Sequence, residues 1–338
     1  MQHYNFGSIE QFRSICKQIK MEAEYQGKDA DGNAIYDLNA PKPVLTFTGT
    51  VKLHGTNAAV VYSKEHGLYA QSRERVLSIE SDNAGFAFYV ESNREYFENK
   101  FAQIMTDDYD TVVIYGEWAG GNIQKGVGIC NVPKKFYPFL MKYFKGDELF
   151  LQEIPYGGND GWCANSSIGI HPITKFDNFK MDIDFNHPEL VQNELIRITE
   201  EVEHECPVAK AFGHSGIGEG VVWTADWNGK QYRFKVKGEK HSSSKVKTLA
   251  SVDTDKIESC QKFAEYAVTE SRFEQALQAV FPDGNLDVKQ IGVLLKWMNT
   301  DIIKEEMDTL VANNLEFKEV AKYIADATKK MFFEHSKL

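Results

Sequence analysis

The sequence predicts an α+β protein in two parts, an antiparallel-sheet domain over residues 1–245 and a small all-helical domain over residues 250–338. Short runs rich in β-branched and aromatic residues dominate the first part, and such runs are typical of strands. Beyond about residue 254 these runs nearly disappear, and apolar residues recur at intervals of three and four, which indicates amphipathic helices. This change of pattern predicts the two domains.

The first domain begins with a helix. Ser8 and Gln11 resemble a capping box, and apolar residues at helical spacing predict a helix over residues 9–21. Glycine, proline and asparagine residues predict loops and turns over residues 22–43. The remaining predicted elements are helices near residues 83–104 and 188–205 and strands at 44–47, 58–62, 68–71, 111–115, 135–144, 220–224 and 231–236.

The second domain follows a polar stretch, His241-Ser242-Ser243-Ser244, which predicts a linker. Turn residues at Pro282-Asp283-Gly284-Asn285 and at Asn313-Asn314 divide the region beyond it. Three helical patterns are predicted there, over residues 254–280, 287–312 and 316–334.

Composition predicts a folded protein from a reducing compartment. Hydrophobic residues make up 42% of the chain and charged residues 26%, which excludes a disordered protein. The five cysteines are odd in number and form no C-x-x-C pair. No apolar run approaches the roughly 20 residues of a membrane span. We therefore expect a cytoplasmic monomer that does not contact membranes.

The distribution of charge bears on the partner. A net charge of -11 argues at first against nucleic acid, because phosphate binding requires concentrated positive charge. From Lys230 to Lys247, however, seven basic residues stand against one acid, Glu239. A solvated hairpin is the common explanation of such a run. The alternation inside the run favours a binding surface instead.

The most informative segment is Val-Lys-Leu-His-Gly-Thr-Asn at residues 51–57, because it can present a lysine amine to a phosphate. If the segment is extended, Lys52 and His54 project from one face, and Gly55 lets the chain turn close to a ligand. A lysine attacks only as the neutral amine, whereas free lysine, with a pKa of about 10.4, is almost fully protonated near pH 7. We therefore expect cations, desolvation or a metal ion to favour the neutral form.

A second segment, Arg233-Phe234-Lys235-Val236-Lys237, supplies such cations. Alternation directs Phe234 and Val236 toward a core and places Lys235 and Lys237 on the opposite face. Two ammonium groups there would neutralise triphosphate oxygens and disfavour protonation of a nearby lysine. Taken alone, an edge strand with lysines in water explains the same pattern.

Two glutamates lie at the ends of predicted strands. Glu117 follows an apolar run and precedes Gly120-Gly121, while Glu219 precedes the strand that begins at Gly220. Carboxylates at such positions can hold a ribose hydroxyl or coordinate Mg²⁺. An isolated glutamate is more often a surface acid, so the two gain weight only from the segments around them.

In their order along the chain, these segments resemble the motifs of the covalent nucleotidyltransferases, which comprise DNA ligases, RNA ligases and mRNA capping enzymes. The matching segments are Lys52-Leu53-His54-Gly55-Thr56-Asn57, Tyr115-Gly116-Glu117-Trp118, Phe136-Tyr137-Pro138-Phe139, Glu219-Gly220-Val221-Val222 and Lys235-Val236-Lys237.

His54 and Asn57, together with Ala119-Gly120 and Ile123-Gln124-Lys125, make the chain resemble the phage-type RNA ligase 2 family, which includes trypanosome editing ligases. The resemblance covers residues 45–245. It implies that the first domain is a nucleotidyltransferase (adenylyltransferase) domain.

The resemblance also implies roles for single residues. Lys52 would attack ATP and form a lysyl-AMP phosphoramidate, while Lys235 and Lys237 contact the α-phosphate. Glu117 would hold the ribose, and Phe139 would stack on adenine.

Four further positions match. Glu219 would help to place Mg²⁺, and Arg73 matches an arginine that follows the first motif. His54 and Asn57 would support later steps. The implied reaction passes AMP to the 5′-phosphate of an RNA and then lets a 3′-hydroxyl displace it, with nicks in duplex RNA as the favoured substrate.

One position departs from the family pattern, because Val51 stands where a glutamate usually precedes the lysine. Two alternatives therefore remain open. The chain could be a DNA ligase or capping-type transferase, although its first motif and the lack of an evident C-terminal barrel argue against this. It could also be a non-catalytic nucleic-acid-binding protein on the same scaffold.

Overall fold

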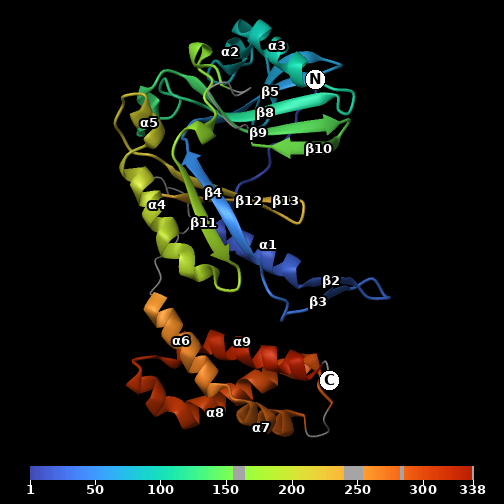
Figure 1. Ribbon diagram of the computed structural model, residues 1–338, viewed down its shortest axis with the longest axis vertical. Helices are drawn as coiled ribbons and strands as arrows, with labels where there is room; N and C mark the ends of the chain where they lie inside the picture. The colour runs from blue at the N-terminus through green and yellow to red at the C-terminus, as the bar shows by residue number, and fades with distance from the viewer. Residues whose placement is uncertain (155–163, 240–253, 282–284, 337–338) are drawn as a thin grey trace. The chain divides into compact units, whose positions relative to one another are not determined.

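The structure is a computed structural model that describes residues 1–154, 164–239, 254–281 and 285–336 (Figure 1). The chain forms two compact units, each assembled from three separate segments. The first unit contains Met1–Lys17, Val44–Asp184 and Val191–Ala250, and the second contains Gln18–Pro43, Phe185–Leu190 and Ser251–Leu338. The predicted linker at 241–244 and the predicted boundary at 245–250 lie outside the described residues, so the division at that point stays a prediction.

The first unit contains a six-stranded antiparallel sheet in the order β10-β9-β8-β5-β6-β7. Each strand predicted in this region is confirmed, and each extends beyond its predicted limits by at least one residue. The sheet consists of β5 (Thr56–Ser63), β6 (Gly67–Ser72), β7 (Val76–Leu77), β8 (Thr111–Ala119), β9 (Lys135–Lys145) and β10 (Glu148–Glu153).

Both faces of this sheet are covered in its centre. Ala58 and Val60 pack with the side chains of α2 (Phe86–Ser92) and α3 (Arg94–Ile104) on one face. Ala59 and Val61 pack on the other face, in a cluster that includes buried aromatic rings. These four residues belong to β5, and burial on both faces explains why the sequence of β5 is a continuous apolar run rather than an alternating one. The predicted helix at 83–104 is confirmed as these two helices.

The second sheet of the first unit has the strand order β1-β13-β12-β4-β11. Its members are β1 (Glu10–Gln11), β4 (Val44–Lys52), β11 (Asn178–Asp184), β12 (Gly220–Trp227) and β13 (Lys230–Lys237). Neighbouring strands are antiparallel, except that β1 pairs with β13 in parallel. The N-terminal helix, α1 (Phe12–Glu24), therefore begins later than predicted, because Glu10 and Gln11 pair with β13.

One face of the second sheet forms an aromatic core. The ring centroids of Phe12 and Phe47 lie 5.0 and 5.2 Å from that of Phe234. Trp223 is fully buried beside them, and a Cβ at Gly49 would lie only 2.9 Å from its ring. Glycine is therefore needed where β4 pairs with β12 opposite Trp223.

The remaining elements of the first unit are short helices and α4. The predicted helix at 188–205 is confirmed as a 3-10 turn followed by α4. The bounds are α4 (Gln192–His204), α5 (Pro207–Ala211) and the 3-10 helices η1 (Gly128–Asn131), η2 (Ser166–Ile168) and η3 (Ile173–Lys175). The turn before α4, η4 (Pro188–Val191), begins in the Phe185–Leu190 segment of the second unit.

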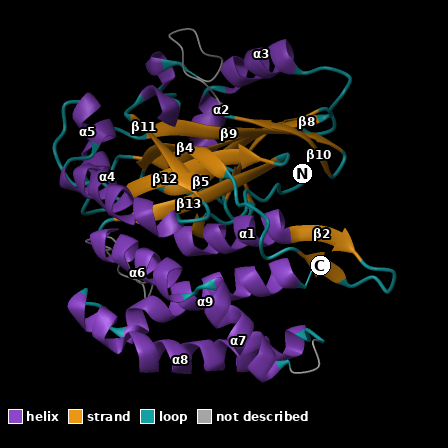
Figure 2. Ribbon diagram, turned by 60° about the horizontal axis from the view of Figure 1, so that its bottom comes forward, coloured by secondary structure: helices purple, strands orange, loops and turns teal. Residues whose placement is uncertain are grey.

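The second unit is built around the four helices α6 (Thr254–Ala267), α7 (Glu270–Val280), α8 (Ile291–Ala312) and α9 (Phe317–His335), with η6 (Val288–Gln290) before α8 (Figure 2). The helical prediction for this region is confirmed. None of the described helices combines the length and apolar character needed to cross a bilayer.

Two segments from earlier in the chain join these helices. Asn39 donates a hydrogen bond to the Lys330 carbonyl at 3.3 Å, and Gln261 lies 3.0 Å from the His187 ring. The prediction of loop over residues 22–43 is wrong in part, because β2 (Tyr25–Lys28) and β3 (Ala34–Tyr36) form a hairpin. These strands are short and largely exposed, so they lack the apolar alternation that reveals a strand.

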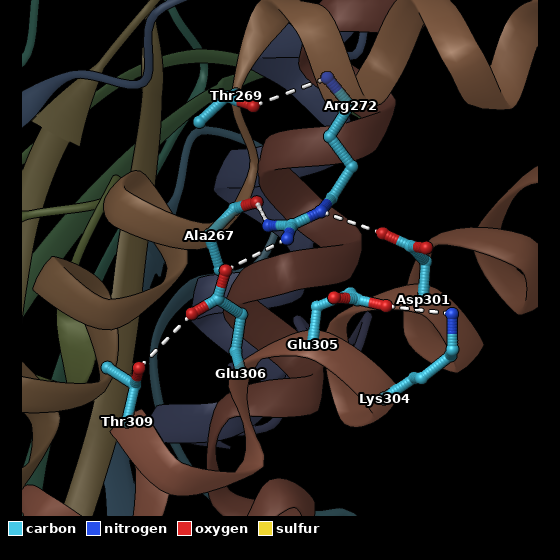
Figure 3. Close-up of polar contacts among 8 residues, drawn as sticks. All are labelled: Ala267, Thr269, Arg272, Asp301, Lys304, Glu305, Glu306 and Thr309. Atoms are coloured by element: carbon cyan, nitrogen blue, oxygen red, sulfur yellow. Dashed lines mark hydrogen bonds and ion pairs between the residues drawn. The ribbon is translucent and has the colours of Figure 1, made fainter.

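A buried charge cluster ties helices of this unit together (Figure 3). Arg272 of α7 donates to Asp301 at 2.9 Å and to Glu306 at 2.8 Å, both on α8, and also to the carbonyl of Ala267. Burial alone would work against the guanidinium charge, but the hydrogen bonds that Arg272 donates to the two carboxylates raise its pKa. The arginine therefore has its charge and three of its donors satisfied within the protein.

Candidate active site

The first unit contains a cavity of about 690 Å³, which is within the usual range for small-molecule sites. Its floor is one face of the second sheet. The side chains that line this floor lie in three neighbouring rows, each made of residues that pair with one another across the strands. The first row contains Lys237 and Lys52 with Gly220 between them; the second contains Lys235, Val222, Thr50 and Asn178; the third contains Arg233, Thr224, Thr48 and Lys180.

The first row brings two lysines to either side of a glycine. Gly220 pairs with Lys52 on β4 and with Lys237 on β13. A Cβ at Gly220 would lie 2.1 Å from the Val236 carbonyl oxygen, and its φ of +146° is one that side chains rarely adopt. Glycine at this position lets the three strands approach, and the residue before it, Glu219, enters between the lysines.

Glu219 connects the cations of this row. Its carboxylate lies 2.6 Å from the Lys52 amine, 2.7 Å from the Lys237 amine and 3.5 Å from Nδ1 of His54. Only 2% of the residue is exposed. Burial works to raise the pKa of Glu219, but the charges and hydrogen bonds of Lys52 and Lys237 outweigh it and lower that pKa. Glu219 is therefore an anion held by cations.

This arrangement differs from the expected cleft of cations alone. The ion pair with Glu219 stabilises Lys52 as an ammonium, so nucleophilic attack requires the pair to separate and the amine to lose a proton. The prediction that Lys52 and His54 share a face is consistent with their contact with one carboxylate.

Lys235 and Lys237 line the cavity as the alternation predicted, while Phe234 and Val236 are buried on the opposite side of β13. Burial, followed by the charges of Lys237 and Lys52, lowers the pKa of Lys235. The edge strand in water is thereby excluded for this segment. An anionic ligand bound beside Lys235 would favour its charged form, which burial and the neighbouring lysines disfavour.

Glu117 stands at the far end of β8, where it pairs with Asn57 of β5. The half-buried carboxylate accepts a hydrogen bond of 2.9 Å from the Gly55 backbone amide. Burial raises the pKa of Glu117 to about 7, against the opposing charge of Lys52. A Cβ at Gly55 would lie 2.5 Å from the Trp118 carbonyl, so glycine permits this approach of the two strands.

The roof of the cavity is aromatic and apolar. Phe139 of β9 lines it and packs against Phe6, with 5.1 Å between ring centroids. Ile9 and Leu140 lie beside them in the lining. Arg73 also lines the cavity, although its side chain is largely exposed and lies 3.5 Å from Glu74.

The structure therefore brings most of the predicted site residues to one cavity. Seven of them line it: Lys52, Asn57, Arg73, Glu117, Phe139, Lys235 and Lys237. Glu219 and His54 do not line the cavity; Glu219 contacts Lys52 and Lys237, and His54 contacts Glu219. The described part of the chain contains no cluster of three acidic, histidine or cysteine side chains arranged for a metal ion. Three of the seven basic residues in the predicted run, Lys240, Lys245 and Lys247, lie outside the described residues.

Sequence reasoning missed two contributions to this cavity. Arg233 lines it, and the alternation that selected Lys235 and Lys237 would also have selected Arg233. Phe6 comes from the N-terminal segment before α1 and carried no recognisable signal.

A family model described as RNA ligase matches residues 45–237, which is more than half of the chain and includes all nine predicted site residues. The chain belongs to the RNA ligase family. No curated protein sequence is detectably similar to this RNA ligase family member over its length.

Solved structures of Naegleria gruberi RNA ligase are similar in outline. The ligase with PPi has a TM-score of 0.44 and 16% identity, and the match covers 72% of this chain and 59% of that one. Two substituted forms, one with AMP and Mn and one with ATP and Mn, each have a TM-score of 0.41, 15% identity and coverage of 70% of this chain and 56% of theirs. This RNA ligase family member thus spans less than three fifths of the length of those ligases, and details of ligand binding do not carry over at this similarity.

Proposed function

We propose that this protein is an ATP-dependent RNA ligase that joins 3′-hydroxyl and 5′-phosphate ends through a lysyl-AMP intermediate on Lys52. The observation that carries the proposal is the row of Lys52, Glu219 and Lys237 in the floor of a nucleotide-sized cavity. Membership of the RNA ligase family supports the same conclusion.

The first step forms a bond between the Lys52 nitrogen and the α-phosphorus of ATP, while the bond from that phosphorus to the pyrophosphate oxygen breaks. The amine must first leave its ion pair with Glu219 and lose its proton. Lys235 and Lys237 offset the charge that develops on the phosphate oxygens. Much of the rate acceleration would come from holding the amine and phosphorus in line.

A divalent cation fits this site only in part. Glu219 is the carboxylate between the two lysines of the first row, and the Lys52 amine, the Lys237 amine and the His54 ring already contact it. Mg²⁺ commonly binds through one or two carboxylates together with substrate phosphates, so Glu219 fits as one protein ligand beside bound ATP. The ion would supply positive charge at the phosphates. Glu219, the residue that would hold the ion, is also the partner of Lys52 in the resting protein.

The other roof and rim residues would position the nucleotide and the RNA ends. Glu117 would accept a hydrogen bond from the ribose, and Phe139 would stack on the base. Arg73 lies at the exposed rim, where it would contact the 5′-phosphate that receives AMP. His54 and Asn57 would act in the transfer and sealing steps.

We further propose that the substrate is nicked duplex RNA and that the protein belongs to the phage-type RNA ligase 2 group. His54 and Asn57 of the first motif support this placement. Val51 is buried and occupies the position where that group carries a glutamate, so its side chain offers no polar contact to a ligand.

The test is to incubate the protein with Mg²⁺ and ATP labelled at the α-phosphate, denature it and measure label on the chain. We expect label on the wild type and none on Lys52→Ala. Lys52→Arg is the matched control, because it retains a cation for Glu219 but lacks the nucleophilic amine. Label on either variant would contradict the assignment of Lys52.

Labelling with GTP, sealing of nicked RNA and nicked DNA, and RNA binding distinguish the alternatives. Label from GTP rather than ATP would indicate capping-type chemistry, and sealing of nicked DNA in preference to nicked RNA would indicate a DNA ligase. Absence of label with either nucleotide, in protein that still binds RNA, would indicate a non-catalytic binding protein.

A further inference from the structure

The third row of the cavity floor contains a cation that the proposed reaction does not use. Arg233 lies on β13, two residues before Lys235, and its side chain is half-buried in the lining. Its guanidinium carbon stands 4.6 Å from the centre of the Phe6 ring. Phe6 and Tyr115, which packs against it, are both buried, so aromatic rings flank Arg233 on one side, while Thr48, Thr224, Lys180 and Gln231 are the polar residues of the lining near it.

The side-chain donors of Arg233 have no acceptor among the residues that the structure describes. Within the described part of the chain, no carboxylate reaches ion-pair distance of the guanidinium and no side-chain hydrogen bond is formed from it. The side chain lines the cavity and is only partly buried. Burial lowers the pKa of Arg233, and the charges of Tyr115 and Asp226 oppose this only in part. Five donors in a fixed planar fork are thus available to a ligand.

A neighbouring lysine increases the positive potential around Arg233. Lys142 of β9 lies 5.4 Å from the centre of the Tyr115 ring, and burial and the charge of Arg233 lower its pKa to about 8. Lys142 is not itself a lining residue. Of these two cations, Arg233 is therefore the one that would contact a ligand directly.

The length of the floor identifies the part of the ligand that reaches Arg233. Side chains on one face of a strand recur every two residues, so the Cα atoms of Arg233 and Lys237 are about 13 Å apart. This is close to the extent of a mononucleotide from its phosphate to the far edge of its base. With phosphate at Lys235 and Lys237, the base would lie over Val222 with its edge toward Arg233.

We propose that Arg233 is a specificity-determining residue that binds the edge of the nucleotide base through its acceptor nitrogens. The inference rests on the proposed function for the identity of the nucleotide. A guanidinium has donors and no acceptor, so it bonds to unprotonated ring nitrogens of the purine and not to the exocyclic amine. Phosphate binding at Arg233 is the competing explanation, and its predictions differ.

The experiment is isothermal titration of wild-type protein and Arg233→Met with adenosine and, separately, with tripolyphosphate. Loss of hydrogen bonds from a charged donor should weaken adenosine binding about tenfold to a hundredfold and leave tripolyphosphate binding within about twofold. Arg197→Met is the matched control, because Arg197 is an exposed arginine of α4 bonded to Glu194 and Glu201 and lies outside the cavity. It should change neither affinity.

Weaker tripolyphosphate binding by Arg233→Met with unchanged adenosine binding would overturn the proposal, as would no change with either ligand. Should Arg233→Met fail to fold, titration of the wild type with 1-deaza-, 3-deaza- and 7-deazaadenosine decides the question. At least one should bind about tenfold more weakly than adenosine, and equal binding by all four would exclude the contact. Lysyl-AMP formation is measured apart from these titrations, so failure of the proposed function and failure of this inference are distinguishable.

Discussion

Arg233 in the first unit and Arg272 in the second are both partly buried, yet their surroundings are opposite. Arg272 donates to two carboxylates and a carbonyl, and these bonds raise its pKa (Figure 3). Arg233 faces aromatic rings and the open cavity, and burial lowers its pKa. Where the partners of a buried cation lie within the protein, removal of the cation destabilises the fold, because its partners are left as uncompensated charges. A buried cation that lacks such partners indicates where a ligand supplies the missing charge or acceptor.

The same contrast exists within the cavity. Glu219 has its charge matched by Lys52 and Lys237, and this match belongs to the resting protein. The proposed reaction would require this match to be undone, because Lys52 would have to leave the carboxylate before it attacks. Under that proposal the lysines and Glu219 exchange partners during the reaction, whereas the cluster around Arg272 has no such requirement.

The largest effect that would sharpen this comparison is expected at Glu219. Glu219→Gln removes the anion between two lysines and the proposed metal ligand, so the rate of lysyl-AMP formation should fall by about 10²- to 10³-fold. The measurement is label transfer from ATP labelled at the α-phosphate, followed over time. Glu200→Gln, at an exposed position of α4, is the control and should leave the rate unchanged. A Glu219→Gln rate within threefold of wild type would show that the bonded row is structural.

The second prediction concerns Arg272. Arg272→Met leaves Asp301 and Glu306 without their cation in a partly buried site, so the second unit should lose about 3 kcal/mol of unfolding free energy. Urea denaturation followed by circular dichroism measures this loss. Adding Asp301→Asn and Glu306→Gln to the variant should recover part of it, because the unpaired charges are then removed. Full stability of Arg272→Met would break the comparison.

The third prediction uses the pH dependence of stability at Glu117. Its pKa is raised from 4.5 to about 7 in the folded protein, so between these values the folded state keeps a proton that the unfolded state has released. Stability should therefore fall as the pH rises from about 4.5 to 7 and level off above that, by an amount on the order of 2 kcal/mol.

Glu117→Gln should abolish this contribution, which appears as a flatter curve of unfolding free energy against pH. The comparison variant is Glu194→Gln. The side-chain hydrogen bond from Arg197 lowers the pKa of Glu194, so its own contribution has the opposite sign. A wild-type and a Glu117→Gln curve of equal slope over this window would contradict the assignment.

The smallest effect is expected for the stability of Arg233→Met. Since no acceptor in the described part of the first unit is bonded to this guanidinium, its removal should change the unfolding free energy by less than about 1 kcal/mol. Thermal unfolding of both arginine variants in one series would compare the two units directly. A loss at Arg233 as large as that at Arg272 would mean that the first unit also relies on its arginine for stability.

Much of the candidate site could be predicted from local sequence. The two-residue alternation at Phe234 to Lys237 identified which lysines face the cavity, and the observed burial of Phe234 and Val236 agrees. The alternation applies equally to Arg233, so its position in the lining could also have been predicted from the sequence. The hairpin of β2 and β3 could not have been predicted, because its exposed strands carry no apolar pattern.

The sequence by itself determined strands β4, β5, β6, β8, β9, β12 and β13, the helical character of the second unit and the chemical types of the side chains at the site. These depend on short-range periodicity and on the residues themselves. The tertiary structure alone decided that Lys52, Glu219 and Lys237 form one row, since this follows from the pairing register of strands far apart in the chain. It also decided the difference between Arg233 and Arg272. Burial and partners come from packing, and neither is written in the local order of residues.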